Sequence, residues 1–335
     1  MEVKLMKFVC RGVLFLLLAL IILSCSSQDL SQNSERAFYE KNSKLKVLTT
    51  TAMINDLVQR VGGDYVDSMA LIQGELDPHS YELVKGDDEK FAMADLIFSN
   101  GLGLEHGLSL KQNLEKNPKV FSLGDPLLKG SGLIITVEGQ YDPHIWMDIA
   151  LWMKTVDTIV NALSQKEPSH AAAYRENGKR LYQEMELADR TVYNLLQSLP
   201  SDRRYLITSH DAFNYFTRHY LAEPHERDSG AWKLRFAAPE GLAPDAQLSV
   251  FDIQEIIDYA ACNNVCVVFP ESNVSRDSLK KIIDAGGKKG LKLQMSPETL
   301  YGDAMGPPGS DGGTYIKMIE HDAAVIFKEL SKGCQ

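Results

Sequence analysis

The sequence predicts two doubly wound α/β lobes bridged by one long helix, and three observations support this fold class. Short apolar runs alternate with amphipathic stretches from residue 45 onward and again after residue 200. This βαβα alternation is typical of a mainly parallel sheet with helices on both faces. Between the two alternating parts, residues 169–199 contain no proline and only one glycine, and they are rich in helix formers. The length of 335 residues accommodates two domains of ordinary size.

The N-terminus is expected to lie outside this fold. Residues 1–24 predict a signal peptide, because basic residues precede an apolar run at 13–23 that is too short to span a bilayer. Residues 22–25, ILSC, resemble a bacterial lipobox, in which Cys25 would become the lipidated first residue. The alternative is an ordinary signal peptide with an incidental cysteine. Residues 25–44 are polar without periodicity, so we expect a lipidated, flexible tether.

The predicted N-terminal lobe spans residues 45–168. Its strands are expected in KVLTTT, YVDSMALIQ, LIFSNG and KVFSL, with amphipathic helices between them and another over 149–167. Pro168 then permits a new helix to start. The linking helix predicted over 169–199 would reach roughly 45 Å and act as a rigid spine between the lobes. The alternative is a long surface helix in a single domain.

The predicted C-terminal lobe spans residues 200–335. Its strands are expected in RYLITS, VCVVFPE and LKLQ, and its last helix in YIKMIEHDAAVIFKEL. Cys262 and Cys266 flank the junction between a predicted helix and a predicted strand. Export implies an oxidising compartment, in which these two cysteines could form a short-loop disulfide. The alternative is that both are small buried hydrophobic side chains. We expect Cys334, near the end of the chain, to be unpaired.

Four side chains that can bind a metal follow predicted strands. The tripeptide Asp-Pro-His occurs twice, and its proline holds His79 and His144 stiffly after an extended residue. His210 follows RYLITS, and Asp303 lies in the late loop LYGDAMG. Ligands collect outside the carboxyl ends of strands in open α/β sheets, and two facing lobes would pool those ends in one cleft. Three imidazoles and one carboxylate would suit a divalent transition metal.

A histidine ligand usually needs a hydrogen-bond acceptor for its second nitrogen. Asp77, Asp142 and Asp211 are candidates by their nearness in sequence. Glu271, at the end of a predicted strand, is either such a partner or a helix-entry residue. We expect structural or solvent roles for the histidines in helical patterns and for one in a surface loop at 223–245. These are His106, His170, His219, His321 and His225.

The motifs resemble those of a known family. DPHSYE, DPHIWMD, TSHDAFNYF and LYGDAMG, in this order, are similar to the solute-binding lipoproteins of zinc, manganese and iron ABC importers, the TroA/LraI group. The resemblance covers residues 45–332 and includes NGLGLE, PESNVS and GGTYIKMI. It implies two lobes joined by a single long helix, with a metal buried between them. It also implies that the four ligands are His79, His144, His210 and Asp303.

The predicted function is that of an exported substrate-binding lipoprotein on the periplasmic or cell-surface side of a bacterial membrane. It would capture one divalent transition metal, Zn, Mn or Fe, and deliver it to a cognate ABC permease. A histidine-rich loop found in many zinc-specific members is missing, and His210 stands where a manganese-selective subset has glutamate. The identity of the metal is therefore left open.

We expect a monomer that is not an enzyme. A catalytic zinc site keeps one position open for water, whereas four protein ligands would close the coordination shell. Two alternatives remain, namely an exported metallohydrolase with Asp303 as base and a metal-binding surface adhesin. The net charge is −10 and no basic block occurs, so no nucleic-acid partner is expected.

Overall fold

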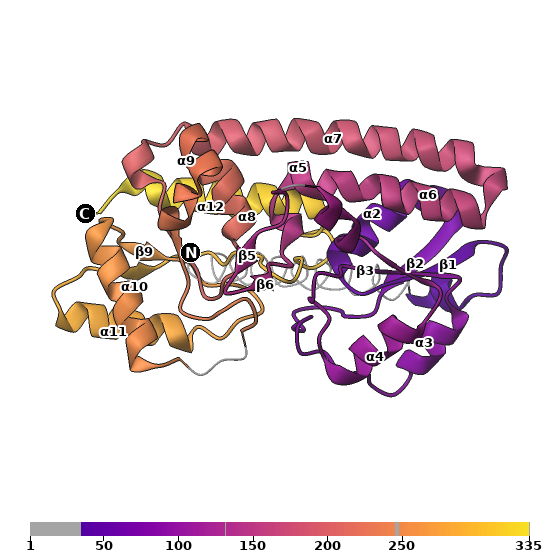
Figure 1. Cartoon of the computed structure of the whole chain (residues 1–335), viewed down its shortest axis with the longest axis horizontal. Coiled ribbons are helices and arrows are strands. Elements are labelled where there is room, and N and C mark those ends of the chain that lie inside the picture. Colours follow the sequence, from indigo (N-terminus) through magenta and orange to yellow (C-terminus); the bar gives the residue numbers. More distant parts are fainter. Residues whose placement is uncertain (1–34, 131, 245–247, 335) are drawn as a thin grey trace, which may run out of the picture.

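The protein consists of two lobes that lie side by side and are spanned by the long helix α7 (Ala171–Gln197), as the computed structural model in Figure 1 shows. The structure describes residues 35–130, 132–244 and 248–334. The predicted signal peptide and Cys25 lie outside these residues. No helix within the described ranges has the length and apolarity that a transmembrane span requires.

The N-terminal lobe is built on a four-stranded parallel sheet in the order β2-β1-β3-β4. Its strands are β1 (Leu45–Thr49), β2 (Val66–Ala70), β3 (Leu96–Ser99) and β4 (Val120–Ser122). Neighbouring residues of β1 enter different cores, because side chains alternate between the two faces of a strand. Val47 packs in the larger hydrophobic cluster and Leu48 in a second one. Both faces of this sheet are therefore covered, as in a doubly wound fold.

The C-terminal lobe repeats this strand order with much shorter strands. Its two parallel pairs are formed by β7 (Leu206–Ile207) with β8 (Phe236–Ala237) and by β9 (Val267–Val268) with β10 (Gln294–Met295). A parallel bridge between Thr208 and Phe269 connects β7 to β9. The spatial order is therefore β8-β7-β9-β10. In both lobes the first strand lies between the second and the third, although the sequence shows no corresponding repeat.

Two helices connect the lobes. Every third or fourth residue of α7 is buried, including Tyr174, Leu181, Met185 and Val192. This stripe packs on α2 (Ala52–Gly62) and α6 (Val156–Lys166) of the N-terminal lobe and on α12 (Tyr315–Lys332) of the C-terminal lobe. Helix α12 also contacts α2. At ~1.5 Å per residue the 27 residues of α7 extend about 40 Å. Together, α7 and α12 hold the lobes in a fixed relation, and the predicted fold class is confirmed.

The other helices, a hairpin and several short turns complete the two lobes. The α-helices are α2 (Ala52–Gly62), α3 (Asp87–Met93), α4 (Leu108–Lys116), α5 (Ile149–Trp152), α6 (Val156–Lys166), α8 (Asn214–Phe216), α9 (Pro224–Ser229), α10 (Val250–Cys262), α11 (Asp277–Lys288) and α12 (Tyr315–Lys332). A hairpin is formed by β5 (Thr136–Val137) and β6 (Gln140–Tyr141). The 3-10 turns are η1 (Gly63–Tyr65), η2 (Asp125–Lys129), η3 (Ile145–Met147), η4 (Met153–Thr155), η5 (Pro168–His170), η6 (Ser201–Arg203) and η8 (Ala231–Arg235), and η7 (Thr217–Leu221) is a π-helical turn.

The end of the predicted tether differs from expectation. Residues 35–39 are helical, and Phe38 is fully buried in the cluster that contains Leu48 and Met69. The Lys46 ammonium donates to the carbonyl of Ala37 at 2.8 Å. Residues 35–44 are therefore part of the N-terminal lobe. One aromatic side chain anchors a segment that is otherwise too short and too polar to show helical periodicity.

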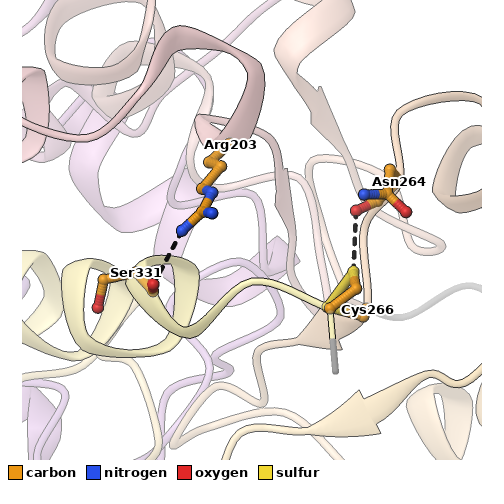
Figure 2. Close-up of a disulfide and its surroundings, with 5 residues drawn as sticks. Arg203, Asn264, Cys266 and Ser331 are labelled. Atoms are coloured by element: carbon orange, nitrogen blue, oxygen red, sulfur yellow. Dashed lines mark hydrogen bonds between the residues drawn. A yellow bond between two sulfur atoms is a disulfide. The ribbon is translucent and has the colours of Figure 1, made fainter.

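Of the two alternatives for Cys262 and Cys266, the disulfide between them is not formed, and the expectation that Cys334 is unpaired is wrong. Cys266 forms a disulfide with Cys334, and their Cα atoms are 5.5 Å apart. Cys262 is a free, exposed residue at the end of α10. Beyond α12 the chain turns at Gly333 (φ 66°) and returns to the strand that begins after Cys266. Figure 2 shows this junction, where Arg203 donates to the carbonyl of Ser331 at 2.9 Å.

Candidate metal centre

His79, His144, His210 and Asp303 meet in one place. His79 lies after β2, His144 after β6, His210 after β7, and Asp303 in the loop between β10 and α12. Their possible ligand atoms all lie within 4.8 Å of one another. The side chains are almost completely buried, with exposed fractions between 0% and 3%. Buried imidazoles and a buried carboxylate are found together where a cation compensates their lost hydration.

The spacing of the four donors fits a metal coordination shell. The Nε2 atoms of His79 and His144 are 3.2 Å apart. The Asp303 carboxylate places Oδ1 3.3 Å from His144 Nε2, and Oδ2 3.1 Å from His210 Nε2 and 3.6 Å from His79 Nε2. Ligand atoms at ~2.0–2.2 Å from a tetrahedral ion are separated by roughly 3.3–3.6 Å. Both carboxylate oxygens face the centre, so Asp303 can bind through one or two atoms.

The repeated Asp-Pro-His motif has a local structural cause. Asp77 accepts the backbone N–H of His79 at 2.8 Å, and Asp142 accepts that of His144 at 2.9 Å. In each copy the aspartate bonds to the backbone two residues later, and the intervening proline has its φ angle fixed by its ring. The motif therefore presents each histidine on a preformed turn.

Two of these histidines contact a carboxylate through Nδ1, the ring nitrogen that faces away from the centre. His144 Nδ1 lies 2.8 Å from Asp142 Oδ1, and His210 Nδ1 lies 2.6 Å from Glu271 Oε2. Protonation at Nδ1 leaves the lone pair of Nε2 directed toward the centre. Glu271 is fixed in turn by the backbone N–H groups of Ser209 and His210, which donate to Oε1 at 2.9 Å each.

Of the candidates for the partner of His210, Glu271 takes this role and Asp211 does not. Asp211 instead accepts a hydrogen bond from Asn214 at 2.8 Å, and Asp77 accepts from the backbone N–H of His79 and from the hydroxyl of Ser80. Glu271 ends the strand next to the one that precedes His210. Neighbouring parallel strands place residues at their carboxyl ends side by side, and this signal was present in the sequence.

Charge strongly perturbs the protonation of the centre. Burial lowers the pKa of His144, but the carboxylates of Asp142 and Asp303 outweigh it and raise the pKa to about 9. The pKa of His210 is raised well above its usual value, because Glu271 and Asp303 overcome the effect of burial. His79 has no comparably strong compensation, and burial lowers its pKa to about 3. Metal binding must therefore displace protons from the first two rings.

The Asp303 carboxylate is the one acidic group among the four side chains. It is buried against the Nε2 atoms of His144 and His210. The pKa of Asp303 is held well below its usual value, since the neighbouring histidines outweigh its burial. A buried, ionised carboxylate needs a compensating positive charge, which protonated histidines supply without metal and a bound cation would supply in their place.

The loop that contains His144 and the segment around Asp303 are joined by hydrogen bonds between the two lobes. The indole of Trp146 donates to the carbonyl of Gly302 at 2.9 Å, and the hydroxyl of Tyr315 donates to the carbonyl of Trp146 at 2.7 Å. A Cβ atom at Gly302 would lie 2.3 Å from Glu271 Oε2 and 3.2 Å from His210. Glycine is therefore required for this close approach.

The other histidines are separate from the centre, except that His106 lies beside it. His106 lies in the loop before α4 instead of in a predicted helix, and its ring centre is 5.6 Å from that of His79. His219 faces Asp189 at 2.9 Å through one nitrogen and Asp148 at 3.7 Å through the other. His170 stacks on a tyrosine, His321 bonds to a backbone carbonyl, and His225 is exposed on α9.

Comparisons with known proteins find relatives that are named for metal binding. Residues 47–329 match the family model described as ZnuA, zinc-uptake complex component A, periplasmic. The chain is 31% identical to the manganese-binding lipoprotein MntA of Bacillus subtilis, covering 86% of this chain and 90% of MntA. It is also 31% identical to the zinc-binding protein TroA of Treponema pallidum, covering 87% and 90%. The crystal structure of Fe(III)-bound YtgA from Chlamydia trachomatis has a TM-score of 0.81 at 41% identity, covering 86% of this chain and 98% of YtgA.

Proposed function

Because the chain belongs to the family of the periplasmic zinc-uptake complex component A, we propose that it captures one transition-metal ion outside the cytoplasm and delivers it to an ABC permease. The resemblance predicted from the motifs is confirmed by this family match. The observation that carries the proposal is the convergence of four buried donor groups at coordination distances. His79, His144, His210 and Asp303 are the proposed ligands.

The cargo is proposed to be zinc, manganese or iron. Similar proteins are named for zinc and for manganese, and one was solved with Fe(III). Three imidazoles and a carboxylate accept each of these ions, and the two available oxygens of Asp303 allow a fifth bond. Zinc would bind more tightly than manganese or iron(II) by the general order of affinities, so affinity alone does not identify the physiological ion.

A transport role suits the centre better than catalysis does. Family members are metal-binding transport components. The proposed ligands are buried at the junction of the lobes, and Asp303 points at the metal position together with three histidines. A hydrolase would need an open coordination position and a free base. We further propose that Cys25 carries a lipid anchor and that the protein acts as a monomer.

Elemental analysis tests the proposal. The soluble chain from residue 26 would be purified without a metal-affinity tag, as wild type, His144→Ala, Asp303→Ala and His225→Ala. About one metal equivalent is expected in wild type and in His225→Ala, whose histidine is exposed on α9. Both ligand variants should lose it. A wild type that takes up none of the three ions would overturn the proposal.

A further inference from the structure

A cavity of about 940 Å³ lies between the lobes, outside the buried centre. Its walls come from the His106 loop and the β5–β6 hairpin on one side, and from residues 238–243 and α10 on the other. We call this cavity the outer chamber. Of the four proposed ligands, only His79 lines it. His79 is therefore the ligand through which the centre meets the chamber.

The outer chamber carries negative charge. Its described lining residues include six carboxylates and no lysine or arginine, the six being Asp125, Glu138, Asp211, Glu240, Asp252 and Glu255. Burial, with the nearby charge of Asp142, raises the pKa of Asp211 to about 7. The negative charge of the chamber therefore comes mainly from the other five carboxylates. These five come from both walls. A concave surface of one sign concentrates ions of the opposite sign and repels ions of its own.

Two histidines lie where the chamber meets the centre. The Nδ1 atom of His106 is 3.3 Å from the carbonyl of Gly103, and a proton shared there leaves the Nε2 lone pair free to bind a cation. His79 differs from the two histidines held by carboxylates. Within the described residues, the polar contacts of its side chain involve only Nε2, although the side chain is 97% buried. Its Nδ1 is therefore left without a partner, and the residue lines the chamber.

We propose that the outer chamber receives the ion as a hydrated divalent cation, that His106 is its first protein ligand, and that it then passes His79 into the centre. This rests on the proposed function. One imidazole with water molecules holds a cation weakly, so the ion moves on to the four-ligand shell. The same negative charge disfavours entry of the metal as an anionic chelate.

Stopped-flow fluorescence with zinc alone tests this path. The ring of Trp146 is 5.3 Å from that of His144, so tryptophan emission should report arrival at the centre. The variants are His106→Gln and the double variant Glu138→Gln/Glu255→Gln. The matched control is Glu176→Gln/Glu186→Gln, which removes the same charge from exposed positions on α7. Release would be measured after adding excess chelator.

A residue that binds the ion only during its passage contacts it neither in the metal-free protein nor in the final complex. His106→Gln should therefore slow association and release by the same factor, roughly three- to tenfold, with an unchanged Kd. The chamber variant should slow association roughly three- to tenfold at low ionic strength and less at high salt, and the control should not. Zinc supplied with citrate should bind at a rate set by the free ion.

Three results would overturn the proposal. Rates of both variants equal to wild type would remove the chamber from the path while leaving the buried centre intact. A changed Kd in His106→Gln without slower exchange would make His106 a supporting residue of the centre. A rate that follows total zinc in citrate would show that the chelate enters. Wild type without any zinc binding would overturn the proposed function as well, which distinguishes the two failures.

Discussion

Replacing Glu271 with glutamine removes the charge that faces His210 while keeping the size of the side chain. Oε1 of Glu271 accepts two backbone N–H groups at 2.9 Å, and Oε2 contacts Nδ1 of His210 at 2.6 Å. The single oxygen of a glutamine amide cannot accept the two backbone N–H groups and also the N–H of His210 Nδ1. If it keeps the backbone bonds, its NH₂ faces Nδ1, and the ring proton must move to Nε2, the atom that would bind the metal.

Both outcomes are unfavourable, and turning the amide around costs more than moving the ring proton. Turning the amide around would leave two buried backbone donors without an acceptor, at about 1–3 kcal/mol each for an unpaired group. Moving the ring proton removes the preferred tautomer, and loss of a carboxylate behind a histidine ligand typically costs 10- to 100-fold in metal affinity, about 1.4–2.7 kcal/mol. We expect the Kd for zinc in Glu271→Gln to rise by roughly this factor.

A competition titration with a chromogenic chelator measures this Kd. Asp322→Asn is the matched control, because Asp322 is also a fully buried carboxyl and accepts only the backbone N–H of Tyr301, at 2.9 Å. Burial raises the pKa of Asp322 well above its usual value, which favours the neutral form that asparagine imitates. An affinity in Glu271→Gln equal to that of wild type and the control would refute the assigned role of the His210–Glu271 pair.

Three further predictions concern pH, the metal and the disulfide. Because Asp142 and Asp303, against the effect of burial, raise the pKa of His144 to about 9, zinc must displace its proton below that pH. The affinity should fall about tenfold for each displaced proton per unit drop in pH, as titrations near pH 6 and pH 8 would show, and a flat profile would contradict this. In the absence of metal, the same proton stabilises the fold below a pH of about 6.5, a contribution lost as pH rises through about 9. Zinc at 100 times its Kd should stabilise the fold by about 2.7 kcal/mol, measured by thermal unfolding with and without chelator, and an unchanged Tm would count against binding to the folded state. Removing the Cys266–Cys334 bond, which joins residues 68 apart, by Cys266→Ala/Cys334→Ala should cost about 4 kcal/mol in chemical denaturation, whereas Cys262→Ala should be neutral; equal effects would refute the pairing.

The sequence contained enough information for the fold class and for the convergence of the proposed ligands. Periodicity indicated the alternating strands and helices, and proline-fixed turns after strands marked His79 and His144 as presented side chains. The order of strands, with β1 and β7 each lying inside their sheets, depends on packing between distant segments. Nothing in local sequence specifies it.

Features that depend on where distant segments meet were predicted incorrectly or only as one of two choices. The partner of Cys266 is set by the return of the chain beyond α12, which no spacing between cysteines reveals. Glu271 is 61 residues from His210, whereas Asp211 is adjacent in sequence but bonds elsewhere. Phe38 anchors residues whose polar composition indicated a tether.

The most direct test of the account is an anomalous diffraction map of crystals soaked with zinc. We expect one strong peak at about 2.0–2.2 Å from Nε2 of His79, His144 and His210 and from the carboxylate of Asp303. The His144–Asp142 and His210–Glu271 contacts should persist behind it. A peak elsewhere, or a peak bound by fewer than these four side chains with water completing the shell, would contradict the proposed closed cargo site.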